Sequence, residues 1–346
     1  MRIPVETRFL RACRRKPVDA TPVWFMRQAG RYLPQYRRLR ARYSMLELCE
    51  SPEAAAEVTL QPVRLLGVDA AILFADILLP LRPMGLRLAF LKGEGPAVTP
   101  PVRAARDVER LREPDPREGL GFVLETVRTV RRELDGEVPL IGFAGAPFTL
   151  ASYMIEGGPS RDYRHTKAMM RAAPGLWRSL MTKLAGVTAE YLKAQVAAGA
   201  QAVQLFDSWV GALSKTDYER FVQPYSARVL RAVARTGVPA VHFGTGTAPF
   251  LESFRDAGGD AIGVDWRLPL DEAWRRVGRG RAIQGNLDPT HLLLPLGALK
   301  PAVRDVVRRA GGRPGHIFNL GHGVLPQTPP GHVRAVVDWV HEWTSR

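Results

Sequence analysis

The chain has 346 residues, of which 46% are hydrophobic, enough to bury the core of one large α/β barrel or of two average domains. Its formal charge of +15 comes from 49 basic and 34 acidic residues and favours an acidic partner. Its arginines are spread along the chain and no nucleic-acid-binding motif occurs, so we expect no nucleic acid as a partner.

No membrane segment or secretory signal is expected. The chain contains no run of about eighteen apolar residues, and its first twenty residues lack the apolar centre of a signal peptide. The two cysteines, Cys13 and Cys49, stand in polar, helix-like surroundings and form no metal-binding spacing. These features predict a cytoplasmic protein of a reducing compartment, with no membrane partner.

Short apolar runs alternate along the chain with segments of helical periodicity. The expected strands are 22–26, 70–74, 140–143, 202–206, 240–243, 261–264, 282–284 and 316–320. The expected helices are 52–66, 119–134, 163–198, 215–236, 249–257, 270–277, 296–310 and 330–343. Eight strands in alternation with helices predict a (β/α)8 TIM barrel, an α/β fold, as a single domain over residues 1–346. An open doubly wound sheet is the alternative, but no GxGxxG follows the first strand.

One segment interrupts this alternation after the second strand. Residues 82–103 are rich in proline and glycine and include an alternating apolar run at 87–90. We expect an inserted excursion there, with a hairpin as its simplest form. Long insertions at the carboxyl end of a strand often cover an active site.

Two arginines, Arg27 and Arg31, follow the first expected strand and flank Gly30. Arginine presents a planar fork of donors that grips carboxylates or phosphates through two hydrogen bonds. The pair therefore indicates an anion clamp on a tight turn. The alternative is two solvated loop arginines in an arginine-rich protein, and this segment alone does not decide between them.

Polar residues also follow the next expected strands, and carboxyl ends of strands are where a barrel builds its site. Asp76 follows the second strand and either serves the site or caps the next helix. Tyr153 is expected in a glycine-rich loop that ends at residues 156–158, which favours function over packing. Ser208 follows the fourth strand in the run Phe206-Asp207-Ser208.

The histidines near strands differ in their surroundings. His242 lies inside an apolar run and is interpreted as a hydrogen-bonded core residue, and His316 begins a strand and is interpreted as structural. His322 stands between two glycines, which allow the backbone close to a ligand, so function is favoured there. Asp265 has two open interpretations, a site carboxylate or the ion-pair partner of an arginine inside the barrel.

Several chemistries lack their motifs. The sequence has no phosphate-binding GxxxxGK[ST] loop, no HExxH and no GxSxG. Neither cysteine lies near a strand end, as a thiolate zinc site would need, and no lysine ends a strand, which disfavours a Schiff base. The remaining expectation is a basic, glycine-lined pocket without a metal or a protein-bound cofactor.

Six motifs together resemble the uroporphyrinogen decarboxylase family. The two long ones are PVWFMRQAGRYLPQYR, from residue 22, and GFAGAPFTLASYMIEGG, from residue 142. The shorter ones, FADIL, LFDSWVGAL, QGNLDP and FNLGHG, follow in the family's order, so the resemblance covers the chain from about residue 21 onward.

The resemblance implies an activity and partners. It implies a cytoplasmic homodimer that binds uroporphyrinogen III, a polyanionic tetrapyrrole with eight carboxylates. The four acetate side chains of this substrate would become methyl groups, giving coproporphyrinogen III for haem and other tetrapyrroles. The family uses no cofactor or metal for this reaction.

The resemblance also assigns residues of this chain. It implies Asp76 and Arg27 as catalytic residues, with Arg27 a candidate to relay a proton, although arginine is in general a poor acid and the proton donor stays open. Arg40 is expected near a propionate. The substrate-binding residues it implies are Arg27, Gln28, Ala29, Gly30, Arg31, Asp76, Tyr153, Phe206, Ser208 and His322.

Two departures from the family pattern occur, and neither is expected to matter. Ala75 stands where the family often has serine, and Asp207 stands where other members have glutamate. The alternative function on the same barrel is a corrinoid- or zinc-dependent methyltransferase, which would need a cysteine near a strand end. A third hypothesis is a non-catalytic tetrapyrrole-binding protein.

Overall fold

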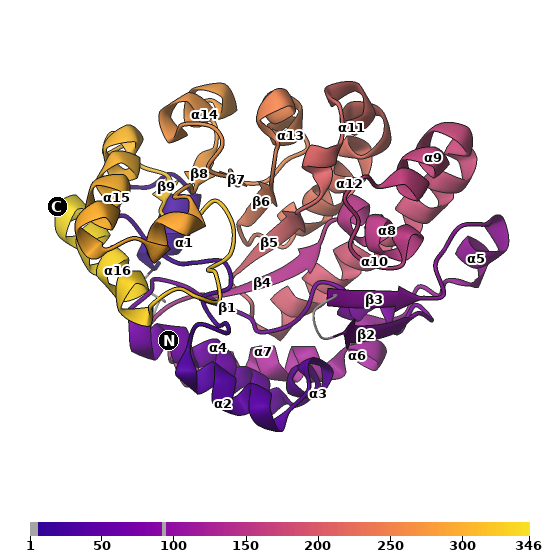
Figure 1. Ribbon diagram of the computed structural model, residues 1–346, viewed down its shortest axis with the longest axis horizontal. Coiled ribbons are helices and arrows are strands. Elements are labelled where there is room, and N and C mark those ends of the chain that lie inside the picture. The colour runs from indigo at the N-terminus through magenta and orange to yellow at the C-terminus, as the bar shows by residue number, and fades with distance from the viewer. Residues whose placement is uncertain (1–5, 92–94) are drawn as a thin grey trace.

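A curled sheet of parallel strands forms the centre of the fold, and helices surround it on the outside (Figure 1). The computed structural model describes residues 6–91 and 95–346. Within these ranges the sheet has seven strands in the order β1-β4-β5-β6-β7-β8-β9. Their bounds are β1 Ala71–Ile72, β4 Leu140–Gly145, β5 Ala202–Asp207, β6 Ala240–Gly244, β7 Ala261–Gly263, β8 Ala282–Gln284 and β9 His316–Ile317. This confirms the predicted barrel class.

Helices follow the strands in the alternation that the sequence predicts. In the first half of the chain they are α1 Arg8–Cys13, α2 Pro34–Arg42, α3 Met45–Glu50, α4 Pro52–Leu66, η1 Leu79–Leu81, α5 Ala105–Arg110, α6 Pro116–Gly119, α7 Gly121–Leu134, α8 Pro147–Glu156 and α9 Arg164–Ala172. In the second half they are α10 Pro174–Ala198, η2 Val210–Ala212, α11 Lys215–Phe221, α12 Gln223–Ala234, η3 Ala248–Phe250, α13 Leu251–Asp256, α14 Leu270–Val277, η4 Pro289–Leu293, α15 Leu296–Ala310 and α16 Pro330–Thr344. None of the described helices has both the length and the apolar composition to cross a membrane.

Two long helices expected from periodicity are each divided in two. The segment 163–198 breaks into α9 and α10 at Pro174, and the segment 215–236 breaks into α11 and α12 next to Pro224. Proline has no backbone N–H and fits the first turn of a helix, so it ends one helix and begins the next. The apolar periodicity continues across both breaks and conceals them in the sequence.

The first expected strand, residues 22–26, closes the barrel without forming a regular ladder. It contacts β9 through a single parallel bridge between Val23 and Phe318. Other backbone N–H groups in the segment donate to side chains instead of to a neighbouring strand. Val23 donates to Asp69 over 2.7 Å, and Met26 donates to Asn319 over 3.1 Å. The prediction of a regular strand at 22–26 is therefore wrong, but the segment lies between β1 and β9, where the first strand of the barrel was predicted.

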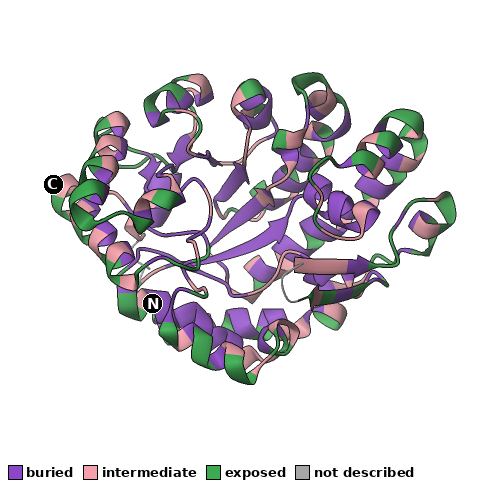
Figure 2. Cartoon of the chain, in the orientation of Figure 1, coloured by how far each residue is buried: buried purple, intermediate pink, exposed green. Residues whose placement is uncertain are grey.

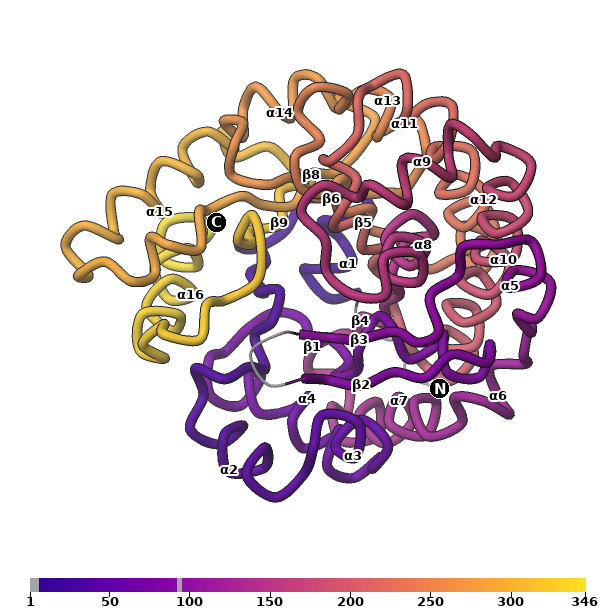
Figure 3. Tube along the Cα trace, turned by 45° about the vertical axis from the view of Figure 1, so that its right-hand side comes forward, coloured from indigo at the N-terminus to yellow at the C-terminus, as the bar shows by residue number. Residues whose placement is uncertain are grey.

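The excursion after the second strand is a hairpin, as expected. β2 (Arg87–Leu91) and β3 (Gly95–Thr99) pair in antiparallel register, and residues 92–94 of the expected excursion lie outside the described residues. The second strand of the hairpin runs beside the end of α8 (Figure 3), where the Val98 N–H donates to the Gly157 carbonyl over 2.9 Å. The insertion is therefore held against the helix that carries Tyr153.

Burial follows the layers of the barrel. The strands of the parallel sheet are buried, and the helices bury the faces that lie against them while their outer faces are exposed (Figure 2). A chain of polar side chains crosses the interior. The indole N–H of Trp24 donates to Gln284 over 3.0 Å, and Gln284 donates to Gln204 over 2.9 Å. Three separate strand positions are thereby connected through the buried centre.

A cluster at the amino-terminal edge of the barrel joins both ends of the chain. Asp69 is only 9% exposed and accepts hydrogen bonds from the Val23 N–H (2.7 Å), the Arg8 guanidinium (3.1 Å) and the His341 imidazole (2.7 Å). Arg8 also bonds to Asp19 over 2.6 Å. Helix α1, the first strand segment and helix α16 therefore meet at one carboxylate.

We predict that Asp69→Asn destabilises the fold by about 2 kcal/mol, because a buried acceptor with three donors loses its charge and one acceptor oxygen. The measurement is urea unfolding at neutral pH. Asp338→Asn is the control, since Asp338 forms an exposed pair with Arg334 and a change there is expected to cost less than about 0.5 kcal/mol. Equal losses in the two variants would contradict the role given to Asp69.

Candidate active site

Arg27 stands at the carboxyl end of the first strand segment with a left-handed backbone, at φ 58°. Its side-chain stem lies against Gly323, where an added Cβ would come within 2.3 Å of the Arg27 Cδ. Arg27 and Arg31 are both exposed. The turn between them is tight, because a Cβ on Gly30 would lie 2.9 Å from the Arg27 carbonyl oxygen. The sequence prediction of two arginines around a close turn therefore matches the local geometry.

The three residues between the arginines differ in what they offer a ligand. The Gln28 side chain is fully buried, accepts from the Phe25 N–H and donates to the Ala70 carbonyl, each over 3.0 Å. It therefore fastens the turn to the start of β1. The N–H groups of Ala29 and Gly30 donate to no backbone acceptor within the described part of the chain. Those two donors remain available to an anion.

Asp76 follows β1 at the same edge of the barrel. Its Oδ1 accepts a hydrogen bond from the Leu78 N–H over 2.8 Å, so it also holds the turn into η1. Burial raises the pKa of Asp76 to about 6, while the Leu78 hydrogen bond and the positive charge of Arg27 act in the opposite direction. The carboxyl group is thus poorly hydrated and close enough to Arg27 for the two charges to interact.

Aromatic rings lie beyond Asp76 at the carboxyl edge of the sheet, which is the mouth of the barrel. Tyr153 lies on α8, not in a loop as the glycines downstream suggested, because the helix continues to Glu156 before Gly157 ends it. Its ring packs 5.9 Å from that of Trp209. Burial and the negative charge of Asp76 raise the pKa of Tyr153 to about 12, so its hydroxyl stays protonated. Tyr153 is therefore a neutral hydrogen-bonding group.

Phe206 is half-buried at the end of β5. It meets Phe143 and Phe243 edge-on, with ring centroids 5.6 Å and 5.8 Å apart. Ser208 follows two residues later and is half-exposed, and its carbonyl accepts from the Thr245 hydroxyl over 2.5 Å. The end of β5 thus presents an apolar ring surface with a serine beside it.

His322 lies in the loop after β9 between Gly321 and Gly323. The pKa of His322 is lowered to about 4, chiefly by burial and also by the cations of Arg27 and Arg267, while Asp265 acts in the opposite direction. The imidazole is therefore neutral near pH 7. It can donate and accept hydrogen bonds without adding charge.

The structure brings four of the expected site residues close to one another. Arg27, Asp76, Tyr153 and His322 interact electrostatically across the mouth. Arg40 lies on α2, where its guanidinium donates to the Tyr43 carbonyl, so it is turned towards backbone.

Two features go beyond the sequence prediction. Asp265 pairs with an arginine, as one of its two interpretations held, but the partner is Arg267, two residues along, and the pair lies at the carboxyl end of β7 instead of inside the barrel. Asp207 is fully buried at the end of β5, where it accepts from Thr149 of α8 over 3.1 Å and from Ser226 of α12 over 3.4 Å. Its place directly before Ser208 in the FDSW motif was the available signal. Asp207 therefore holds α8 and α12 to the strand that carries Ser208.

The remaining histidines are structural. His316 is buried and hydrogen-bonded to the Gly285 carbonyl over 3.0 Å, as interpreted. His242 is in the core, but neither ring nitrogen has a hydrogen-bond partner among the described residues, contrary to the expectation. It stacks on Phe254 with centroids 3.7 Å apart, and burial lowers its pKa to about 3. No three metal-ligating side chains cluster within residues 6–91 and 95–346.

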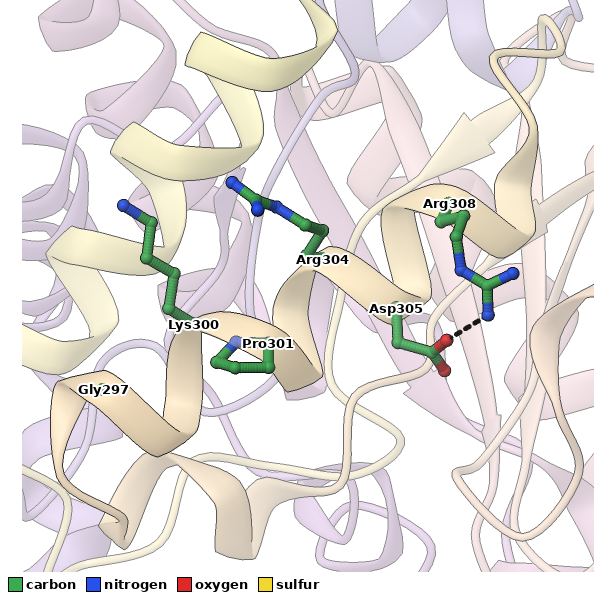
Figure 4. A pocket seen from close by; sticks show the side chains of 6 residues that line it. All are labelled: Gly297, Lys300, Pro301, Arg304, Asp305 and Arg308. Carbon is green, nitrogen blue, oxygen red and sulfur yellow. Dashed lines mark hydrogen bonds and ion pairs between the residues drawn. The ribbon is translucent and has the colours of Figure 1, made fainter.

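A hollow of about 350 Å³ lies elsewhere, along the outer helix α15 (Figure 4). Asp305 and Arg308 form an ion pair on its wall. The other lining residues are Gly297, Lys300, Pro301 and Arg304. None of these belongs to the carboxyl edge of the sheet, so the hollow is separate from the candidate site.

The fold and the mouth together define a (β/α)8 barrel with cationic, carboxylate and aromatic groups at the carboxyl edge of its strands. The family model described as "Uroporphyrinogen decarboxylase (URO-D)" matches residues 5–343. The chain belongs to the uroporphyrinogen decarboxylase family. This confirms the resemblance drawn from the six motifs.

Individual relatives agree with the family match. The chain is 62% identical over 334 residues to the uroporphyrinogen decarboxylase of Sorangium cellulosum, covering 96% of this chain and 95% of that protein. It is 54% identical to the enzyme of the same name from Solibacter usitatus, with 98% of each chain covered. Among solved structures, a methyltransferase from Methanosarcina mazei has a TM-score of 0.82 at 21% identity, with 99% of each chain covered. That last likeness shows a shared fold.

Asp207 leads to a prediction about stability. Burial raises its pKa from 3.8 to about 7, so the folded protein keeps a proton that the unfolded chain loses. Stability is therefore lost as the pH rises from about 4 through about 7. Asp207→Asn cannot ionise, and we expect its free energy of unfolding relative to wild type to rise on the order of 2 kcal/mol between pH 5 and pH 8. Urea unfolding at the two pH values measures this difference, and a pH-independent difference would contradict it.

Proposed function

We propose that this chain removes the carboxyl groups of the four acetate side chains of uroporphyrinogen III and so produces coproporphyrinogen III. The reaction belongs to tetrapyrrole biosynthesis, as the names of its relatives imply. The observation that carries the proposal is the half-buried Asp76 carboxyl, with a raised pKa, beside Arg27 at an aromatic-lined mouth. These residue types suit a ring of pyrroles with carboxylates around its edge. One domain, residues 1–346, carries the activity.

The chemistry needs a stabilised cation. Protonation of a pyrrole ring carbon makes the ring cationic, and the acetate carbon–carbon bond then breaks, releasing CO2 while its electron pair enters the ring. A second proton adds to the exocyclic methylene carbon and produces the methyl group, and the ring carbon then loses the first proton, which restores the neutral pyrrole. A fixed anion near the ring favours the first step, because preorganised charge is worth most in a poorly hydrated site.

Asp76 supplies that anion and accepts hydrogen bonds from the pyrrole N–H groups. Arg27 and Arg31 bind carboxylates of the substrate, and the N–H groups of Ala29 and Gly30 contact the same anions. Gln28, whose own N–H donates to the Phe25 carbonyl, supports this contact by holding the turn. Arg27 is also the candidate to relay a proton.

The remaining mouth residues bind the macrocycle and its edge. Phe206 packs against the face of the ring. Tyr153, Ser208 and His322 donate hydrogen bonds to peripheral carboxylates. The neutral state of His322 suits this role, since burial keeps its pKa at about 4.

The activity is tested by anaerobic incubation with uroporphyrinogen III, followed by oxidation and separation of the porphyrins. The expected products are the seven-, six-, five- and four-carboxylate series. Methyl transfer from a corrinoid to a thiol is the competing activity on this fold. Absence of the carboxylate series would overturn the proposal.

We predict that Asp76→Asn lowers kcat by roughly 100- to 1000-fold with a smaller change in KM, because the neutral amide cannot stabilise the ring cation. The amide oxygen can still accept the Leu78 N–H, so the turn is expected to be kept. In the wild type, kcat/KM falls as the pH drops through about 6, where Asp76 gains its proton, and the variant lacks this limb. Asp338→Asn is the matched control, and turnover near wild type in Asp76→Asn would make the assigned role wrong.

We predict that Gly323→Ala lowers kcat/KM about 10-fold, because the new methyl group displaces the Arg27 stem, whose Cδ would lie 2.3 Å away. Most of the loss is expected in KM, measured by steady-state kinetics. Gly331→Ala is the control, since an added Cβ there meets nothing within 4 Å. An unchanged kcat/KM in Gly323→Ala would show that the position of Arg27 is not required.

The assembly and location follow from the family likeness. We propose a homodimer in the cytoplasm, without a resident metal or cofactor. The burial of both free cysteines, Cys13 and Cys49, is compatible with a reducing compartment. Light scattering of the purified protein and cell fractionation test these two points.

A further inference from the structure

A second arginine-containing group stands at the carboxyl end of β7, outside the roles assigned above. It consists of Asp265, Trp266 and Arg267. The Asp265 side chain is 3% exposed, whereas that of Arg267 is 52% exposed, and the two form an ion pair. The Arg267 guanidinium also lies over the Trp266 ring, 4.4 Å from its centroid. The cation is therefore held in place by a buried carboxylate and an aromatic face, while half of it faces solvent.

This group borders the His322 loop. A Cβ on Gly321 would lie 2.5 Å from the Trp266 backbone nitrogen and 2.8 Å from its ring. On the other side of His322, Gly323 packs directly on the stem of Arg27. The histidine loop is thus enclosed by Arg27 on one side and by Trp266 with its stacked arginine on the other.

We infer that Arg267 binds a peripheral carboxylate of the tetrapyrrole substrate, on the side of His322 opposite to Arg27. The inference rests on the proposed function, since it names a further contact for the same substrate. A macrocycle with carboxylates around its whole edge needs cations on more than one side of the mouth. Arg27 and Arg31 come from one loop and cover one side.

The hydrogen bonding of the pair permits this role. Asp265 Oδ2 also accepts from the Gly246 N–H over 2.7 Å, and Oδ1 accepts from the Arg267 backbone N–H over 3.2 Å. The carboxylate therefore stays partly satisfied if the guanidinium turns towards a ligand. Of the five guanidinium N–H donors, those on Nε and Nη2 have no acceptor among the described residues. These donors can bind a carboxylate of the substrate.

The neighbouring carboxylate limits the strength of the contact. Asp265 already neutralises much of the Arg267 charge, so a second anion gains less than it would from an unpaired arginine. A simple loop-fixing ion pair is the competing explanation. It differs in its outcome, because loss of a loop-fixing pair would lower thermal stability and kcat together, while loss of a binding contact raises KM.

The test compares Arg267→Gln with Arg313→Gln in steady-state turnover of uroporphyrinogen III. Arg313 is a matched control, since its guanidinium also stacks on a tryptophan, 4.2 Å from the Trp274 ring centroid, but it precedes β9 at the opposite edge of the barrel. We expect about a 5-fold rise in KM for Arg267→Gln, with kcat within 2-fold and an unchanged melting temperature. The same kinetic constants as wild type are expected for Arg313→Gln.

Arg267→Lys is the second variant and keeps the charge but not the planar fork. A rise of about 2-fold in KM is expected for it, and this variant decides the question if Arg267→Gln fails to fold. An unchanged KM in the folded variants, or a loss of stability and kcat without a change in KM, would overturn the inference. Wild-type protein that forms no carboxylate series would instead overturn the proposed function, so the two failures are distinguishable.

Discussion

The side-chain hydrogen bonds that hold residues 22–26 in the gap between β1 and β9 are the constraint on which the site depends. Asp69 and Asn319 satisfy backbone N–H groups that a regular ladder would otherwise pair. Gln28 does the same for Phe25 and fixes the next turn to the start of β1. Because these bonds end the strand at Met26, Arg27 can adopt its left-handed backbone at the mouth. The same hydrogen bonds therefore close the barrel and place Arg27.

The pKa values of Asp76 and His322 at the mouth are set mainly by burial, because neither side chain forms an ion pair within the described part of the chain. Asp76 faces Arg27 without forming a direct ion pair with it, so desolvation outweighs the attraction and its pKa rises to about 6. His322 is kept neutral by burial and by the nearby cations. The mouth therefore combines a carboxyl group of raised pKa with arginine side chains. Such an arrangement suits a substrate that is anionic at its edge and becomes cationic at its centre.

Much of the fold was predictable because an apolar run marks the place of each strand, although β1 and β9 are shorter than the runs at 70–74 and 316–320. The glycines around His322 predicted a close approach of the backbone to a ligand, whereas the close contact that the structure shows is between Gly323 and the stem of Arg27. The Asp265–Arg267 pair was harder to predict, since a loop backbone decides whether residues two apart can meet. Burial of Asp207 depends on how α8 and α12 pack on β5, which no local pattern reports. The methyltransferase-like fold, at 21% identity, shows that the barrel alone does not specify the chemistry.

The Asp69 cluster has a consequence for how the protein folds. Its partners are Arg8 near the start of the chain and His341 near the end. The contact between Val23 and Phe318, which completes the barrel, also joins residues far apart in the sequence. Before α16 packs, Asp69 lacks the hydrogen bond from His341. Arg27 therefore gains its working position only after segments distant in the sequence have packed around residues 22–26.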